Sequence, residues 1–76
     1  MRSANFSRYK AIGQAVKKQR VLKGWTQEEL ANKASISLSY LTKIEAPATD
    51  KVFSLEVLFV IADTLEIPVT DLLDDI

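Results

Sequence analysis

The chain of 76 residues is long enough for one small domain, and its composition excludes several kinds of site. It has no cysteine, which excludes disulfides and thiolate metal sites, and no histidine, the commonest general base and metal ligand. Nine basic and two acidic residues give residues 1–43 a net charge of +7, whereas one basic and eight acidic residues give residues 44–76 a net charge of −7. This asymmetry indicates a side that faces a polyanion, with ordinary solvated helix faces as the alternative.

No segment of the sequence predicts export or membrane insertion. The longest apolar run, Val57 to Ala62, is far shorter than the roughly 20 residues that span a bilayer. Residues 1–10 have no apolar segment followed by a cleavage site. We therefore expect a cytoplasmic protein without a membrane partner.

A short tail precedes the predicted domain. Residues 1–7 have no helical periodicity and are expected to be mobile, so the folded domain is predicted to span residues 8–76. Arg2 could reach a phosphate or a minor groove, as the arms of some DNA-binding domains do. A tail without a function is the commoner case.

The first helix is predicted at about residues 8–23. Its apolar stripe consists of Tyr9, Ile12 and Val16. Gly24 then supplies a left-handed end. Gly13 costs the helix about 1 kcal/mol relative to alanine, which indicates the close approach of another helix. Arg20 falls near the buried stripe, where a guanidinium needs a partner.

Residues 26–46 hold two short helical patterns, which are separated by a three-residue break at 35–37. Thr26 and Glu29 have the spacing of a capping box at the start of the first pattern. Ser37 can cap the second pattern. Two short helices joined by so tight a turn cannot lie antiparallel, so they must cross at a steep angle. The stretch therefore predicts a helix-turn-helix.

Two further helical patterns follow. One begins at Ser54, and its predicted core stripe consists of Leu55, Leu58, Ile61, Ala62 and Leu65. Val57 borders this stripe and Val60 points nearly opposite, so the helix is apolar almost all round and is expected to be covered by another surface. After the break at Pro68, a final turn or two of helix is expected at residues 69–76. The sequence thus predicts an all-α domain of five helices.

The order and spacing of these residues resemble the Cro/repressor-type helix-turn-helix family of phage and bacterial regulators. The resemblance covers residues 12–73, and its strongest parts are Ile12-Gly13, Arg20, residues 24–31, Ile44-Glu45, Ser54-Leu55, Leu58, Ile61-Ala62 and Leu65. It implies a compact five-helix bundle of the lambda-repressor-like DNA-binding type. It also implies that Arg20 pairs with Glu45, at the end of the recognition helix, with two solvated side chains as the alternative.

One stretch departs from the family pattern. Pro47 stands where the family commonly has glycine, and it ends the helix by disfavouring helical geometry at Ala46. The loop to Ser54 is about two residues longer than usual. Its only cation is Lys51, whereas many relatives carry several there for phosphate contacts. Part of the backbone-binding surface is therefore in doubt.

In this motif the second helix, here about Leu38–Glu45, enters the major groove. The resemblance implies a base-reading surface formed by Leu38, Ser39, Thr42 and Lys43. The candidate phosphate contacts are Gln27, Ser37, Tyr40 and Lys51.

The chemistry of the base-reading residues limits what they can recognise. Lys43 can donate to guanine N7 and O6, and Ser39 and Thr42 can bond to either base type. Leu38 can only contact a thymine methyl or exclude water. The helix holds no Arg, Asn or Gln for a bidentate base contact, so we expect modest direct readout and much affinity from phosphates.

A second copy of the domain is expected, because one domain reads only one half-site and the next half-site lies about 34 Å away. Apolar residues without an internal partner usually mark an interaction site. The predicted dimer interface consists of Val57, Val60, Leu72, Leu73 and Ile76, with Asp71, Asp74 and Asp75 at its rim. Alternatively, these residues cover the rest of a longer chain.

The sequence thus favours a transcriptional regulator that binds a specific double-stranded DNA operator as a homodimer. The alternative is a protein-interaction module, antitoxin-like or a co-regulator, which the zero net charge, the outward Leu38 and the poorly basic loop favour. An enzyme is a distant third, because Asp74 and Asp75 have no readable nucleophile–base partners. No cofactor, metal or small-molecule substrate is expected.

Overall fold

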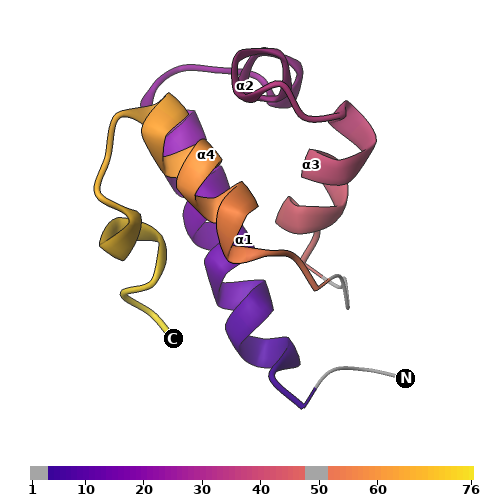
Figure 1. Cartoon of the computed structure of the whole chain (residues 1–76), viewed down its shortest axis with the longest axis vertical. Helices are drawn as coiled ribbons and strands as arrows, with labels where there is room; N and C mark the ends of the chain where they lie inside the picture. Colours follow the sequence, from indigo (N-terminus) through magenta and orange to yellow (C-terminus); the bar gives the residue numbers. More distant parts are fainter. Residues whose placement is uncertain (1–3, 48–51) are drawn as a thin grey trace.

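The computed structural model describes residues 4–47 and 52–76, which form four α-helices and one 3₁₀ helix without any strand (Figure 1). The elements in chain order are α1 (Phe6–Leu22), α2 (Gln27–Ala34), α3 (Leu38–Glu45), α4 (Leu55–Leu65) and η1 (Val69–Leu72). None of the helices in these two ranges is long and apolar enough to cross a membrane. The predicted all-α class is confirmed.

The count of five α-helices is wrong, because the last element is a single 3₁₀ turn. The amides of Asp71 and Leu73 donate to carbonyls three residues earlier, those of Pro68 and Thr70, at 3.0 Å each. The segment has only four residues, and it opens with the β-branched pair Val69 and Thr70, which favour an α-helix weakly. A cluster of carboxylates near its C-terminal end also opposes the helix dipole.

The first helix begins two residues earlier than predicted. The Asn5 carbonyl accepts from the amides of Arg8 and Tyr9, and the Arg8 guanidinium donates to Asn5 Oδ1 at 2.8 Å. These polar contacts start the helix where the sequence has no apolar periodicity. Residues 6 and 7 therefore lie in α1. The predicted roles of Arg2 and Lys51 fall on residues outside those that the structure describes.

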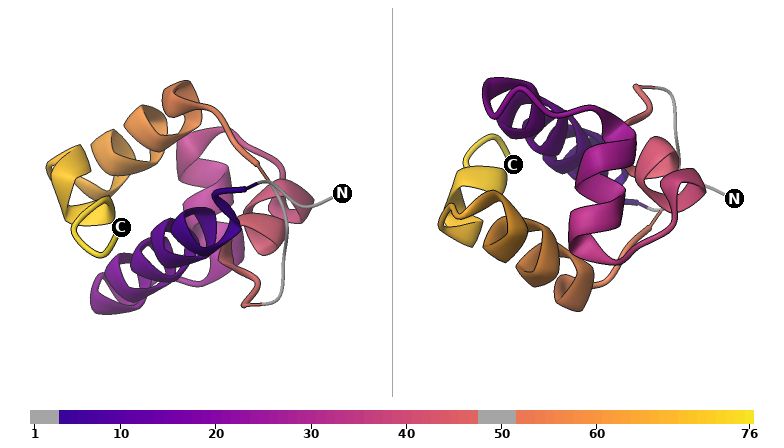
Figure 2. Two further views of the ribbon diagram at one scale, coloured as in Figure 1. Left: turned by 90° about the horizontal axis from the view of Figure 1, so that it is seen from below. Right: turned by 90° about the horizontal axis from the view of Figure 1, so that it is seen from above.

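The core lies where α1, α2, α3 and α4 meet, and it includes Val16, Leu30, Leu41, Ile44, Ile61 and Leu65, all fully buried. In Figures 1 and 2, η1 lies on one side of the α1–α4 pair and α3 on the other. Gly13 sets the distance between α1 and α3, since a Cβ at this position would overlap the carbonyl oxygen of Ile44. The predicted close approach of another helix is confirmed.

The orientation of α4 differs from the prediction at its first turn. Leu55 was expected in the core but is 59% exposed, whereas Val57 is 6% exposed. Val57 lies one and two turns before Ile61 and Leu65, so it continues the stripe that packs inward. Leu72 of η1 is also buried. The expectation that Val57 and Leu72 lack an internal partner is therefore wrong.

Candidate nucleic-acid interface

Both helices of the helix-turn-helix begin with a side-chain cap. The Thr26 hydroxyl accepts from the Glu29 amide at 3.0 Å, and the Glu29 carboxylate accepts from the Thr26 amide at 2.9 Å. These two bonds form the predicted capping box. The Ser37 hydroxyl accepts from the Tyr40 amide at 3.0 Å and caps α3 as predicted. The caps define where α2 and α3 begin.

The turn between α2 and α3 depends on a serine in a left-handed conformation. Ser35 ends α2 with φ of 57°. The next amide, that of Ile36, donates back to the Ala31 carbonyl at 3.0 Å, and the Ile36 side chain packs against the core. This reversal takes the chain directly from α2 to α3, so the turn needs only three residues.

A buried ion pair joins α1 to the end of α3. Arg20 Nη2 lies 2.9 Å from Glu45 Oε1, and Arg20 Nε donates to Glu45 Oε2 at 2.9 Å. The two side chains are 10% and 1% exposed. The third guanidinium nitrogen, Arg20 Nη1, donates to the Trp25 carbonyl at 2.7 Å. This bidentate geometry compensates the desolvation of both charges.

Glu45 also accepts from two glutamine side chains. Gln27, the first residue of α2, donates through Nε2 to Glu45 Oε1 at 3.0 Å. Gln14 of α1 donates to the Glu45 carbonyl at 2.8 Å and so caps the end of α3. Gln14 could not be identified from the sequence, because one amide side chain on a helix has no recognisable spacing. Glu45 thus connects α1, α2 and α3.

The outer side of α3 carries the four predicted base-reading residues. Ser39, Thr42 and Lys43 are exposed, and Leu38 is 44% exposed although it is apolar. Tyr40 is partly buried against the core. The arrangement presents two hydroxyl groups, one ammonium group and one hydrocarbon side chain on a single helical surface. Such a surface has the size and chemistry to contact base edges in a major groove.

Two lysines lie over the single tryptophan at the α1–α2 connection. Lys23 Nζ is 5.8 Å and Lys33 Nζ is 5.0 Å from the centre of the Trp25 ring. Both distances permit a cation–π interaction. The pair concentrates positive charge beside the start of α2.

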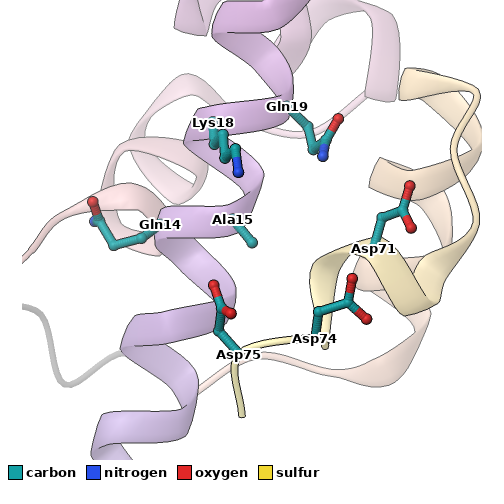
Figure 3. Close-up of a pocket in the computed structure, with 7 residues that line it drawn as sticks. All are labelled: Gln14, Ala15, Lys18, Gln19, Asp71, Asp74 and Asp75. Atoms are coloured by element: carbon teal, nitrogen blue, oxygen red, sulfur yellow. The ribbon is translucent and has the colours of Figure 1, made fainter.

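Three aspartates near the C-terminus, Asp71, Asp74 and Asp75, gather on the side of α1 that faces η1 (Figure 3). A pocket of about 470 Å³ lies between α1 and the C-terminal segment, residues 69–76. It is lined by Gln14, Ala15, Lys18, Gln19, Asp71, Asp74 and Asp75. Figure 3 shows the three aspartates across this pocket from Lys18 and Gln19. In the described ranges, no group of three or more His, Cys, Asp or Glu residues could hold a metal ion. The three carboxylates on this side would repel phosphates.

The predicted dimer residues are divided between the core and the surface. Val57 and Leu72 are buried, Val60 and Leu73 are partly buried, and Ile76 is exposed. Two residues outside the prediction, Leu55 and Phe59, are exposed one turn apart on α4.

An apolar groove of about 400 Å³ lies beside Leu55 and includes Leu73 and Ile76 in its lining. The Tyr9 and Phe53 rings in its wall meet edge to face at 5.0 Å. The exposed apolar surface of α4 therefore continues into the C-terminal segment.

Comparison with known proteins places this geometry in a family. A helix-turn-helix family model matches residues 16–72. No curated protein matches the chain significantly in sequence.

Solved structures with the same fold include two regulators. The restriction-modification controller protein C.AhdI from Aeromonas hydrophila has a TM-score of 0.80 and 27% identity, covering 88% of this chain and 98% of its own. The clp gene regulator ClgR from C. glutamicum has a TM-score of 0.79 and 33% identity, covering 88% and 84%. A hypothetical transcription factor, NHTF from Neisseria, shares the fold with a TM-score of 0.81 and 23% identity, covering 96% and 82%. The chain is a non-enzymatic member of the Cro/repressor-type helix-turn-helix family of DNA-binding transcription regulators.

Proposed function

We propose that the chain regulates transcription by binding a specific double-stranded DNA operator as a homodimer, with α3 in the major groove. The observation that carries this proposal is the outer side of α3, where Leu38, Ser39, Thr42 and Lys43 are all exposed. The buried pair of Arg20 and Glu45 fixes α3 against the rest of the domain. A fixed reading surface can dock on base edges without rearranging.

Phosphate contacts would come from the start of α2 and of α3. Gln27 uses one amide hydrogen on Glu45 and keeps a second hydrogen that can donate to a phosphate oxygen. Ser37 accepts from the Tyr40 amide, so its own hydroxyl hydrogen is available as a donor. Tyr40 lies beside them, and Lys51, outside the described residues, is a further candidate from the sequence. Helix N-termini also favour phosphate electrostatically.

The homodimer would form through the exposed apolar surface of α4 and the C-terminal segment. We assign the contact to Leu55, Phe59, Val60, Leu73 and Ile76, in place of a surface that included Val57 and Leu72. Apolar residues that gather at a groove usually mark an interaction site. Asp71, Asp74 and Asp75 would lie at the rim, where water screens their repulsion. The contact leaves α3 free for DNA.

DNA binding is tested by selecting sites from a random duplex library and titrating the selected duplex at two salt concentrations. We expect a selected sequence with two half-sites about 34 Å apart and an affinity that falls steeply with salt. The matched control is a random duplex of the same length. If neither duplex binds in a salt-dependent way, the proposal fails and a protein-interaction module, for which the exposed Leu38 would be the contact, replaces it.

The dimer is tested by sedimentation equilibrium of the wild type and of Phe59→Glu. We expect the wild type to dimerise at about 100 μM and the variant to be monomeric, because a charge would be buried at the apolar contact. Leu22→Glu is the matched control, since Leu22 is an exposed apolar residue at the end of α1. If Phe59→Glu dimerises as well as this control, α4 is not the contact.

A further inference from the structure

The outer side of α3 consists of two parallel stripes with different chemistry. Leu38 and Thr42 are four residues apart and lie one above the other on the helix. Ser39 and Lys43 have the same spacing and form the neighbouring stripe. The second stripe is polar. Whether the first stripe is polar or apolar towards DNA depends on whether the Thr42 hydroxyl is free to donate a hydrogen bond.

The Thr42 hydroxyl forms a hydrogen bond within α3. Thr42 Oγ1 donates its hydrogen to the Leu38 carbonyl at 2.8 Å. It therefore has no hydrogen for guanine N7 or O6 or for thymine O4, and it can act towards a base only as an acceptor. The methyl group of Thr42 remains, beside a leucine side chain without any polar group. The Leu38–Thr42 stripe is therefore mainly apolar towards DNA.

Only one of the four bases presents an apolar group in the major groove, the 5-methyl group of thymine. A leucine that is 44% exposed at the start of α3 would leave hydrocarbon in water unless such a group covers it. On the basis of the proposed function, we propose that the Leu38–Thr42 stripe reads thymine methyl groups. Part of the specificity then lies in this stripe, and each half-site carries thymine opposite it. Lys43, on the neighbouring stripe, contacts an adjacent guanine.

The test replaces single thymines of the selected operator by deoxyuridine, which removes the methyl group and leaves every hydrogen-bonding atom. Wild-type protein should bind about fourfold more weakly for each methyl group that it loses from contact. Substitution of thymines elsewhere in the same duplex should leave affinity unchanged.

Variants on the two stripes assign the effect to its residues. Leu38→Ala should bind thymine and deoxyuridine operators almost equally, so that the fourfold ratio falls towards one. Thr42→Val should keep the ratio, because it retains the methyl group, whereas Thr42→Ser should reduce it. Leu22→Ala, at an exposed leucine on α1, is the matched control and should keep the full ratio.

The outcomes separate this inference from the proposed function. Specific binding that is insensitive to every deoxyuridine substitution overturns methyl readout and leaves operator binding intact. A ratio that persists in Leu38→Ala and in Thr42→Ser also overturns it. Absence of specific binding to any duplex overturns the proposed function, and the inference with it. The wild-type comparison decides the question even if a variant fails to fold.

Discussion

The helix-turn-helix, α2 and α3, is stabilised differently from the C-terminal part of the domain, α4 and η1. Each helix of the first begins at a side-chain cap, and Glu45 binds the polar groups of Arg20 and Gln27. In the second, α4 also begins at a cap, because the Ser54 hydroxyl accepts from the Val57 amide at 3.2 Å, but Val57, Ile61 and Leu72 contact the other elements through apolar burial. Hydrogen bonds are directional, so they fix how the helices are oriented, whereas apolar burial is not. Polar contacts between helices therefore help to orient α2 and α3, whereas α4 and η1 are positioned against the rest of the domain mainly by apolar burial.

The largest expected effect tests the pair at the centre of the first region. Glu45→Gln should lower the free energy of unfolding by roughly 3–5 kcal/mol, because it leaves the Arg20 guanidinium buried without a counter-charge. Urea denaturation followed by circular dichroism measures this. Glu66→Gln is the matched control, since Glu66 is exposed and its oxygen lies 4.0 Å from Lys23 Nζ, so its loss should cost under about 1 kcal/mol. Equal, small losses would contradict the role given to Glu45.

The contact between α1 and α3 gives the next effect. Gly13→Ala should cost about 3 kcal/mol, because the new Cβ meets the backbone carbonyl of Ile44, which cannot move away like a side-chain tip. Gly24→Ala is the comparison: no atom lies within 4 Å of a Cβ there, but φ is +76°. Its cost should be about 1–2 kcal/mol, from the left-handed conformation alone. Denaturation midpoints that rank the two glycines in reverse would show that α1 and α3 are further apart.

A third pair of variants tests the orientation of α4. Val57→Ala should cost about 2 kcal/mol, from two buried methyl groups and the cavity they leave, whereas Leu55→Ala should stay within about 0.5 kcal/mol. Monomer stability is best compared at low protein concentration, where no dimer contributes. The reverse ranking would support the core stripe expected from the sequence, with Leu55 inward.

The smallest effect concerns the capping box of α2. The backbone amide of Thr26, with help from its hydroxyl and from Lys33, holds the pKa of Glu29 below its ordinary value of 4.5. A lowered pKa in the folded state stabilises the protein above pH 4.5, and this contribution is lost as the pH falls through the folded-state pKa.

Glu29→Gln keeps the hydrogen-bonding shape of the box and removes the charge. The difference in stability between wild type and this variant should therefore shrink on acidification from pH 6 to about pH 3. An NMR titration of the Glu29 carboxylate in wild type and Thr26→Ala should show the pKa rising in the variant. An unchanged pKa would mean that the Thr26 hydroxyl does not contribute.

The sequence could predict local capping hydrogen bonds but not the details of tertiary packing. Thr26, Glu29 and Ser37 mark helix starts through hydrogen bonds whose spacing is fixed, and the structure has those caps. For α4, Leu55 and Val57 are both apolar and only two residues apart, so periodicity alone could not decide which one faces inward. Hydrogen bonds between distant residues, such as that from Gln14 to the Glu45 carbonyl, have no sequence spacing at all. Those details depend on tertiary packing.

The connections of Glu45 also bear on how α3 behaves over time. A helix of eight residues is too short to persist alone in water, so α3 is ordered only while its partners hold it. Because Arg20, Gln14 and Gln27 reach Glu45 from α1 and α2, α3 cannot open without releasing both helices. Its amide hydrogens should therefore exchange with solvent only through global unfolding. A reading helix of this kind reaches its target already ordered, and association costs little backbone conformational entropy.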